Sequence, residues 1–463
     1  MQTLKKIRLR SKEERRFRSG HPWVFSNELQ ESPKGLLMGE VVELHDSGGG
    51  FLAYGFGNPH SLISFRELSR DRDSGFFSEG RVSVDFFRDR FARARAFRKS
   101  WFSPDQSHRM IYGESDGLSG LILDRFCGEK MVVDVIQPHS AGMDLHLDSI
   151  MKALGEPQDR TGSIPEKMQH YAVLRRDASS REKEGIDRLP VVVMDLRSKT
   201  EVRDPEFLRN FRFCVSGIMG SSIFLSADLI SGQKTGFFFD QLQNIRLLET
   251  LVLRKIRNDR GFLTARVPGD SRPFRVLDLC SYVGQWSVHL LQTLQEREVL
   301  PAEFTCVDAS APALEFAKSN LDAQSRASGT EDRVRIHILK ADVLESLPGI
   351  SEKGYDIVIA DPPAFIKNRK SLPQGKQAYV QLFQTAIQKT APGGLVVCCS
   401  CSQILSPEDF TEVLSKASRR SGRRVRWLAQ GSPSFDHFTR STFQEGHYLK
   451  CMIGQVDEVG AAD

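Results

Sequence analysis

The second half of the chain alternates apolar runs of strand length with longer segments whose apolar positions recur at helical spacing. Strands that alternate with helices in this way indicate a doubly wound, mainly parallel sheet of the Rossmann-like α/β class. A last pair of strands would close one edge of this sheet. The predicted strands span 274–280, 304–308, 334–339, 355–360, 394–399, 423–429 and 447–455, and the predicted helices span 284–294, 311–323, 376–390 and 407–420.

The first half has a different pattern. Residues 1 to about 75 alternate short β-like runs with Gly and Asn-Pro turns, which predicts a small β-barrel. Apolar positions at helical spacing among arginines over 82–101 predict an amphipathic linker helix, and β-rich stretches over 108–215 flank a polar segment at 155–188. We therefore expect a β-barrel domain at 1–78, a central α/β domain with the linker helix at 79–215, and the parallel-sheet domain at 216–456.

Composition places the chain among soluble globular proteins. Of its 463 residues, 40% are hydrophobic and 27% are charged, and no apolar run is long enough to span a membrane. The basic N-terminus lacks the apolar stretch of a signal peptide, so we expect a cytoplasmic protein. The eight cysteines have no regular spacing and mostly lie in apolar runs, which is typical of reduced core thiols.

Basic residues are clustered although the net charge is only +5. Clusters of this kind favour a polyanionic partner such as nucleic acid. They lie in the first eighteen residues, over 88–99 and over 419–426.

Two short motifs point to chemistry that the surrounding residues do not support. Lys234-Thr235 resembles the end of a phosphate-binding loop, but Gln233 precedes it and no glycine stands at the required offset. Cys398 and Cys401 form a C-x-x-C, but no second cysteine or histidine pair has zinc spacing. We therefore expect no metal site.

Acidic residues follow successive predicted strands of the sheet domain. Asp278 leads into a turn that includes Ser281 and Gly284, and Asp308, Asp342 and Asp361 end later strands. An acid after the second strand can accept both hydroxyls of a ribose. Only one glycine lies in 278–285, whereas a dinucleotide site needs several. S-adenosylmethionine carries no pyrophosphate, so this series of acids fits that cofactor better.

Cys401 follows the apolar run 394–399 between two serines. Carboxyl ends of parallel strands meet at one edge of a sheet, so Cys401 and Asp361 are expected to face one pocket. A thiolate can add to carbon 6 of a pyrimidine and make carbon 5 nucleophilic enough to take a methyl group. Asp361 can hydrogen-bond the ring nitrogen and amine of cytosine and favour the protonated adduct. A lone strand-end cysteine is otherwise often a buried structural residue.

With these residues in place, the chain resembles the RlmI-type bacterial 23S ribosomal RNA methyltransferases. That family joins a PUA domain and a central α/β domain to a class I S-adenosylmethionine-dependent methyltransferase domain. The matching motifs cover nearly the whole length: Gly20-His21-Pro22-Trp23-Val24-Phe25, Tyr112-Gly113-Glu114-Ser115-Asp116-Gly117-Leu118, Arg181-Glu182-Lys183-Glu184-Gly185, Lys234-Thr235-Gly236-Phe237 with Asp240-Gln241, Asp361-Pro362-Pro363-Ala364-Phe365, Ser400-Cys401-Ser402 and Tyr448-Leu449-Lys450-Cys451. One departure is Gln285, which stands where a second glycine is usual.

The resemblance implies methylation at carbon 5 of a cytosine in 23S ribosomal RNA, with Cys401 as the nucleophile. It implies that the acids Asp278, Asp308, Asp342 and Asp361 serve the cofactor and the active site. It also implies that Lys234, Thr235, Gly236, Phe237 and Gln241 wall the pocket for the cofactor or the base. The oligomeric state stays open, with a homodimer as one option.

Two other functions fit part of the same pattern. Asp361-Pro362-Pro363 followed by an aromatic resembles sites that methylate amino nitrogens, although Phe365 lies one residue later than the aromatic of that motif. Relatives of this architecture act on nitrogen 7 of guanine, and a nitrogen acceptor needs no thiol. A non-catalytic RNA-binding factor for ribosome assembly could also retain this fold.

Overall fold

A computed structural model describes residues 4–155, 164–165, 167–258, 272–345, 347, 349–350 and 354–457. Parts of 254–273 and of the polar segment at 155–188 lie outside these residues. The chain forms two compact units. Unit 1 comprises Met1–Val215, Ala227–Phe239 and Phe435–Gly446, and unit 2 comprises Ser216–Ser226, Asp240–Ser434 and His447–Asp463.

Unit 1 begins with a five-stranded sheet in the order β1-β3-β4-β5-β2. Most positions of its central strands are buried or half-buried, and Leu44 and Phe65 from this sheet pack with Phe17 from α1 in one apolar core. The elements are β1 (Lys5–Arg8), α1 (Glu14–Arg18), β2 (Trp23–Phe25), β3 (Val41–His45), β4 (Phe51–Gly57) and β5 (Ile63–Ser69).

A second, six-stranded sheet of unit 1 has the order β13-β12-β11-β10-β9-β8, and only β10 and β11 within it run parallel. The predicted linker helix is α2, which begins after Ser83 and buries Phe86, Phe87 and Phe91 on one face. The elements are α2 (Val84–Lys99), β8 (His108–Tyr112), β9 (Leu121–Cys127), β10 (Met131–Pro138), α3 (Ala141–Leu145), α4 (Leu147–Gly155), β11 (Gln169–Leu174), β12 (Val192–Asp195) and β13 (Thr200–Glu201).

Two short strand pairs complete the β-structure outside the main sheets. They are β6 (Phe77–Ser78) with β7 (Arg81–Val82), and β14 (Phe211–Ser216) with β15 (Ser222–Ala227). The segment Phe435–Gly446 belongs to unit 1 although it lies between two strands of unit 2 in sequence. Asp436 anchors it there, because its buried carboxylate accepts the backbone N–H of Arg109 at 2.7 Å.

Unit 2 contains the predicted doubly wound sheet, in the order β18-β17-β16-β19-β20-β22-β21. The strands β16 to β20 run parallel, and β22 pairs antiparallel with both β20 and β21. The fold class is therefore confirmed. The strands are β16 (Phe274–Leu279), β17 (Ala302–Asp308), β18 (Val334–Lys340), β19 (Tyr355–Ala360), β20 (Thr390–Ser400), β21 (Val425–Gln430) and β22 (Lys450–Val456).

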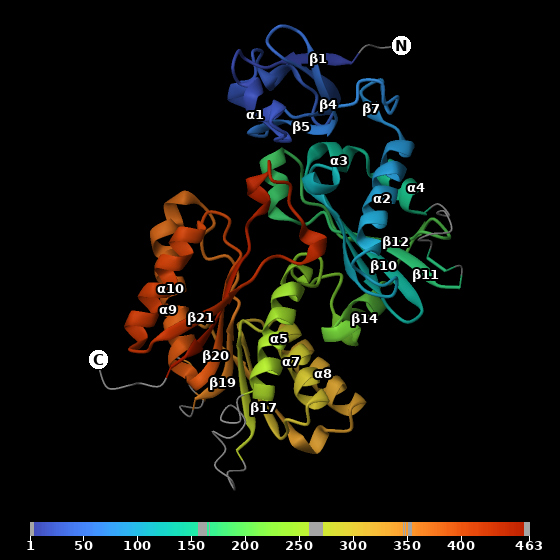
Figure 1. Ribbon diagram of the computed structural model, residues 1–463. Coiled ribbons are helices and arrows are strands. Elements are labelled where there is room, and N and C mark those ends of the chain that lie inside the picture. Colours follow the sequence, from blue (N-terminus) through green and yellow to red (C-terminus); the bar gives the residue numbers. More distant parts are fainter. Residues whose placement is uncertain are drawn as a thin grey trace. The chain divides into compact units, whose positions relative to one another are not determined.

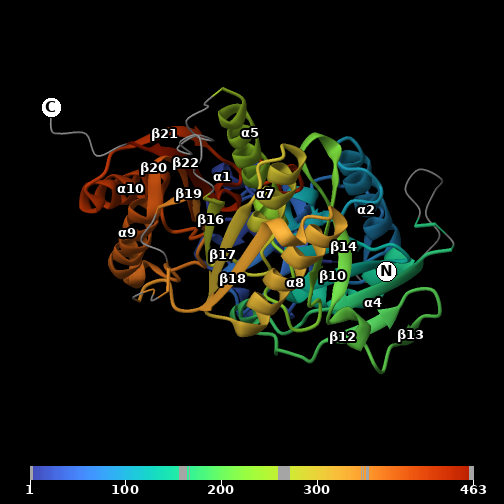
Figure 2. The ribbon, with the colours of Figure 1, turned by 90° about the horizontal axis from the view of Figure 1, so that it is seen from below.

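Helices cover both faces of this sheet, as Figures 1 and 2 show. One face carries α5 (Leu242–Asn258), α7 (Gln285–Glu296) and α8 (Ala311–Ala327), and the other carries α9 (Leu372–Lys389) and α10 (Pro407–Ser421). Central strands covered on both sides must be apolar throughout, which explains the continuous hydrophobic runs of β19 and β20. Among the described residues, no helix is both long and apolar enough to cross a membrane.

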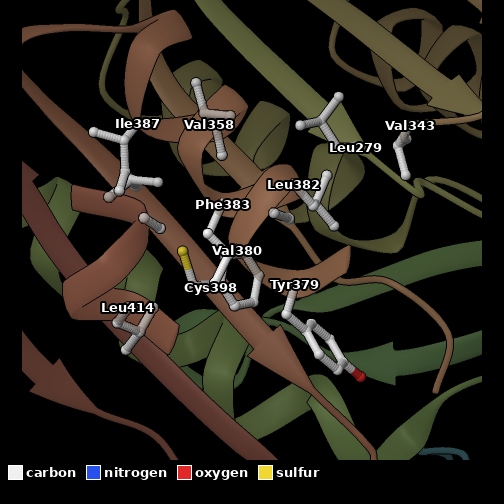
Figure 3. Packing of buried hydrophobic residues seen from close by; sticks show 14 of the residues in the cluster. Leu279, Val343, Val358, Tyr379, Val380, Leu382, Phe383, Ile387, Cys398 and Leu414 are labelled. Atoms are coloured by element: carbon white, nitrogen blue, oxygen red, sulfur yellow. The ribbon is translucent and has the colours of Figure 1, made fainter. Parts of the chain in front are cut away.

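The core beneath α9 and α10 contains one of the two cysteines of the C-x-x-C motif. Figure 3 shows the Cys398 side chain among Val380, Phe383 and other apolar residues of this cluster. Cys398 and Cys399 are 0% exposed, and burial raises the pKa of both thiols well above the usual value. Both are therefore packed as inert core residues of β20.

Candidate functional site

The centre of the sheet in unit 2 is a topological switch point. The chain passes from β16 to β17 on one side, while β19 pairs with the other side of β16. In open α/β sheets, ligands bind in the crevice outside the carboxyl ends of the strands at such a point. Asp278 lies near the end of β16 and Asp361 follows β19, so both acids stand where this fold favours a ligand.

Asp278 is a fully buried carboxylate with an incomplete set of partners. One oxygen accepts a hydrogen bond from Ser287 Oγ at 2.7 Å, and the other has no partner among the described residues. Burial raises the pKa of Asp278 to about 7, and the charges of Asp361 and Asp308 add to this rise. A buried acceptor without a donor is costly, so this oxygen is suited to a cationic or donating group of a ligand.

The turn that follows β16 has unusual backbone geometry. Cys280 and Tyr282 have φ angles of 66° and 49°, which are rare for residues with side chains. Such strain is concentrated at ligand-binding turns. Ser281 lies in this turn and is 1% exposed. Gly284 has a φ angle of 78°, and close packing also favours glycine there, since a Cβ would lie 3.1 Å from Ala317.

Asp308 fastens this turn to the next strand. One of its oxygens accepts the backbone N–H of Tyr282 and the other accepts that of Ser310, both at 2.9 Å. Each carboxylate oxygen can accept more than one hydrogen bond, so ribose hydroxyls could still bind here. Asp342 follows β18 and accepts the backbone N–H of Leu344 at 2.9 Å.

Asp361 is held by two side-chain donors. Gln241 Nε2 donates to one oxygen at 2.7 Å, and the indole N–H of Trp286 donates to the other at 3.0 Å. Gln241 in turn accepts a hydrogen bond from Asn244 at 2.7 Å, which fixes the orientation of its amide. These contacts favour the ionised carboxylate and point it in one direction.

Cys401 lies beside the turn that carries Asp361. Its thiol donates a weak hydrogen bond to the carbonyl of Pro362 at 3.9 Å, and the residue is only half-buried, unlike Cys398 and Cys399. The next residue, Ser402, is held by Tyr379, whose hydroxyl lies 2.8 Å from Ser402 Oγ. The structure therefore places the thiol of a half-buried cysteine next to the Pro362–Pro363 peptide, directly after Asp361.

Four residues that we predicted to wall the pocket belong to unit 1. The Thr235 hydroxyl donates to the buried Asp124, and Phe237 packs against Phe213 with ring centroids 5.1 Å apart. A Cβ at Gly236 would lie 2.8 Å from Leu229, and the ammonium of Lys234 lies over the ring of Phe238. Each therefore has a contact within its own unit, and its part in cofactor or base binding stays a prediction.

Sequence reasoning missed two residues of this site. Trp286 is 1% exposed, and a buried indole N–H needs an acceptor, so a tryptophan beside the predicted cofactor turn was a usable signal. Lys450 is 8% exposed and donates to the carbonyl of Ser402 at 2.6 Å. A lysine at the start of an apolar strand is unusual, but the sequence alone does not connect it with Cys401.

Comparisons with known proteins agree with this geometry. Residues 7–70 match the model of a PUA-like domain, and residues 253–428 match that of an FtsJ-like methyltransferase. The ribosomal RNA large subunit methyltransferase I of Serratia proteamaculans is 30% identical over 439 residues, covering 93% of this chain and 94% of the relative. That of Alteromonas mediterranea is 29% identical over 455 residues, covering 97% and 98%.

A solved structure supports the fold over the same length. The crystal structure of SMU.776 complexed with SAH has a TM-score of 0.68 and 17% identity, covering 97% of this chain and 100% of that one. The fold is the Rossmann-like fold of that solved structure, and the matched model places the chain in the methyltransferase class. The chain belongs to the family of the ribosomal RNA large subunit methyltransferases I, which makes it an RNA methyltransferase.

The residues present fit S-adenosylmethionine. The unpartnered oxygen of Asp278 suits a cationic amino group, and Asp308 retains acceptor capacity for a ribose. Both lie at the strand ends where this fold binds its ligands.

Proposed function

We propose that this protein methylates carbon 5 of a cytosine in large-subunit ribosomal RNA through a covalent bond to Cys401. The observation that carries the proposal is the half-buried Cys401, whose thiol contacts the carbonyl of Pro362, the residue after Asp361. An acceptor that is already nucleophilic, such as a base nitrogen, would need no thiol at this place. The relatives named above are large-subunit ribosomal RNA methyltransferases, which gives the substrate class.

In this proposal Cys401 acts first. Its thiolate adds to carbon 6 of the cytosine, and the electron pair of the ring's double bond moves to carbon 5. S-adenosylmethionine supplies the methyl group that carbon 5 takes. A base then removes the proton of carbon 5, the double bond reforms, and the bond to Cys401 breaks. The target base must leave its stack or lie in a single strand to reach the thiol.

Asp361 binds and polarises the cytosine. Its carboxylate accepts hydrogen bonds from the exocyclic amine and from ring nitrogen 3, which takes a proton from solvent as the thiolate adds, so the charge that moves into the ring is neutralised. Gln241 and Trp286 hold the carboxylate in one orientation. This preorganisation lowers the cost of aligning the acid with the base.

We propose that the remaining acids bind the cofactor. Asp278 takes the amino group, Asp308 takes the ribose hydroxyls and Asp342 takes the adenine amine, with Ser281 and Gly284 in the turn between the first two. We also propose that 1–78 is an RNA-binding domain, that 79–215 is a central α/β domain with the linker helix, and that 216–456 carries out the methylation.

Cofactor affinity is expected to rise with pH between about pH 5.5 and 7.5. The pKa of Asp278 is raised to about 7, so the group is neutral below that pH and attracts a cationic amino group only above it. Affinity should fall by up to about tenfold for each pH unit below 7. Isothermal calorimetry with S-adenosylmethionine measures this. Asp278→Asn should bind weakly at every pH, and a flat profile in the unaltered protein would contradict the role of Asp278.

The reaction itself is tested on ribosomal RNA. Large-subunit RNA from cells that lack this gene is digested to nucleosides, which are quantified by mass spectrometry with and without added protein and S-adenosylmethionine. We expect the protein to restore 5-methylcytidine at one position. Formation of 7-methylguanosine instead would establish the base-nitrogen reaction, and restoration of no modified nucleoside would favour an assembly factor.

A further inference from the structure

Lys450 is a buried lysine close to the proposed nucleophile. It is the first residue of β22 and pairs with Ser400 of β20. Its ammonium donates to the carbonyl of Ser402 at 2.6 Å and to that of Tyr448 at 2.7 Å. Ser402 directly follows Cys401, so the ammonium is held at the carbonyl of the residue after the proposed nucleophile.

The Lys450 ammonium has hydrogen-bond acceptors but, among the described residues, no carboxylate to balance its charge. An ammonium has three N–H donors, and the two carbonyls take two of them. Among the residues that the structure describes, no carboxylate lies within ion-pair distance of Lys450 Nζ. Burial lowers the pKa of Lys450 to about 8, and a negative charge on Cys401 acts in the opposite direction. Buried charges are normally paired, so a counter-ion is expected.

We propose that Lys450 is a positioning residue whose ammonium stabilises the thiolate of Cys401 before attack and again when the sulfur leaves. This inference rests on the proposed function. The thiol gives its proton to solvent water, and Lys450 stays protonated throughout, so that its ammonium balances the charge of the thiolate that forms. When the bond between sulfur and carbon 6 breaks, its electron pair returns to a sulfur that again lies beside a cation.

The other titratable groups around Cys401 cannot supply this charge. Burial raises the pKa of Tyr379, and a charged Cys401 raises it further, so this hydroxyl stays neutral at neutral pH. Asp361 across the site is an acid, and its charge disfavours a thiolate. Cys399, deeper in β20, has a pKa raised by burial and is a neutral thiol. Lys450 therefore has the sign that activation requires.

The test measures the ionisation of Cys401 directly. The full-length protein is alkylated with iodoacetamide from pH 5 to pH 10, and modification of Cys401 is followed by peptide mass spectrometry. We expect a midpoint below the ordinary thiol value of about 8.5. Lys450→Met and Lys450→Gln should raise it by about one unit or more, which lowers the thiolate fraction at neutral pH about tenfold. Lys450→Arg should restore most of the shift.

These variants separate charge from structure. Gln is neutral but keeps donors for the two carbonyls, so a purely structural role of Lys450 predicts an unchanged midpoint in Lys450→Gln. Lys255→Met is a matched control, because Lys255 donates to Gln455 farther along β22 and should leave the midpoint unchanged. An equal midpoint in the unaltered protein and both neutral variants would overturn the proposal.

The proposed function fails by a different result. If Cys401→Ala still methylates carbon 5 while the midpoint depends on Lys450, the ion pair stands and covalent catalysis falls. If Cys401→Ala is inactive and the midpoint does not depend on Lys450, only the role of Lys450 falls.

Discussion

Cys401→Ala is expected to abolish methyl transfer and to leave S-adenosylmethionine binding intact. Without the thiolate, carbon 5 of cytosine stays a poor nucleophile, so the rate should fall by roughly 10³-fold or more. The residue is half-buried and its thiol hydrogen bond to Pro362 is weak, so its loss should change stability little. Transfer of radiolabelled methyl groups to ribosomal RNA measures the rate, and calorimetry measures cofactor binding.

Cys398→Ala is the matched control. Cys398 lies on β20, the strand that Cys401 follows, and is 0% exposed within the apolar core. Its loss leaves a small cavity that costs about 1 kcal/mol of unfolding free energy, but it removes no reacting group. We expect near-normal transfer from this variant. Normal transfer from Cys401→Ala would rule out a covalent route, whereas equal loss in both variants would indicate damage to the fold.

Asp361→Asn is expected to lower turnover by roughly 10²- to 10⁴-fold, the usual range for a positioned acid or base. The neutral amide cannot balance the charge of a protonated ring nitrogen 3, and its NH₂ group would face one of the donors that now bind the carboxylate, Gln241 or Trp286. Single-turnover kinetics with saturating RNA and cofactor measure the chemical step. A loss confined to RNA affinity would contradict a role in the reaction.

Asp356→Asn serves as the control for this change. Asp356 lies near the start of β19, the strand that Asp361 follows, and pairs with Arg272 at 2.9 Å. Weakening that pair should cost about 1–3 kcal/mol of stability and leave turnover of the folded protein unchanged. Asp356→Asn should therefore lower the thermal unfolding temperature and keep the single-turnover rate, whereas Asp361→Asn should lower the single-turnover rate.

The parallel sheet could be predicted from the sequence because strands covered on both faces need continuous apolar runs, and such runs are legible. The first residues of two elements were predicted too late in the sequence. The strand β20 begins at Thr390 and the helix α9 at Leu372, each four residues before the predicted start. The acids at strand ends could be found for the same reason as the strands. Asp278, Asp308 and Asp361 follow apolar residues directly, whereas Lys340 and Ala341 separate Asp342 from its apolar run.

The side chains that hydrogen-bond Asp361 could not be predicted from the sequence. Trp286 and Gln241 reach Asp361 from a helix and a turn that are distant from it in sequence, and only the packing of the sheet brings them together. The placement of Phe435–Gly446 in unit 1 was likewise invisible, because no composition change marks the segment. The position of Lys450 near Cys401 could be recognised only from the register of β22 and the hydrogen bond to Ser402.

Trapping of the adduct tests the central claim most directly. The protein is incubated with S-adenosylmethionine and large-subunit ribosomal RNA that carries 5-fluorocytidine, and the products are separated on a denaturing gel. Fluorine at carbon 5 cannot be removed as a proton, so an adduct through Cys401 should persist as a protein–RNA band that Cys401→Ala abolishes. Methylation of ordinary RNA without any Cys401-dependent band from the fluorinated RNA would contradict covalent catalysis.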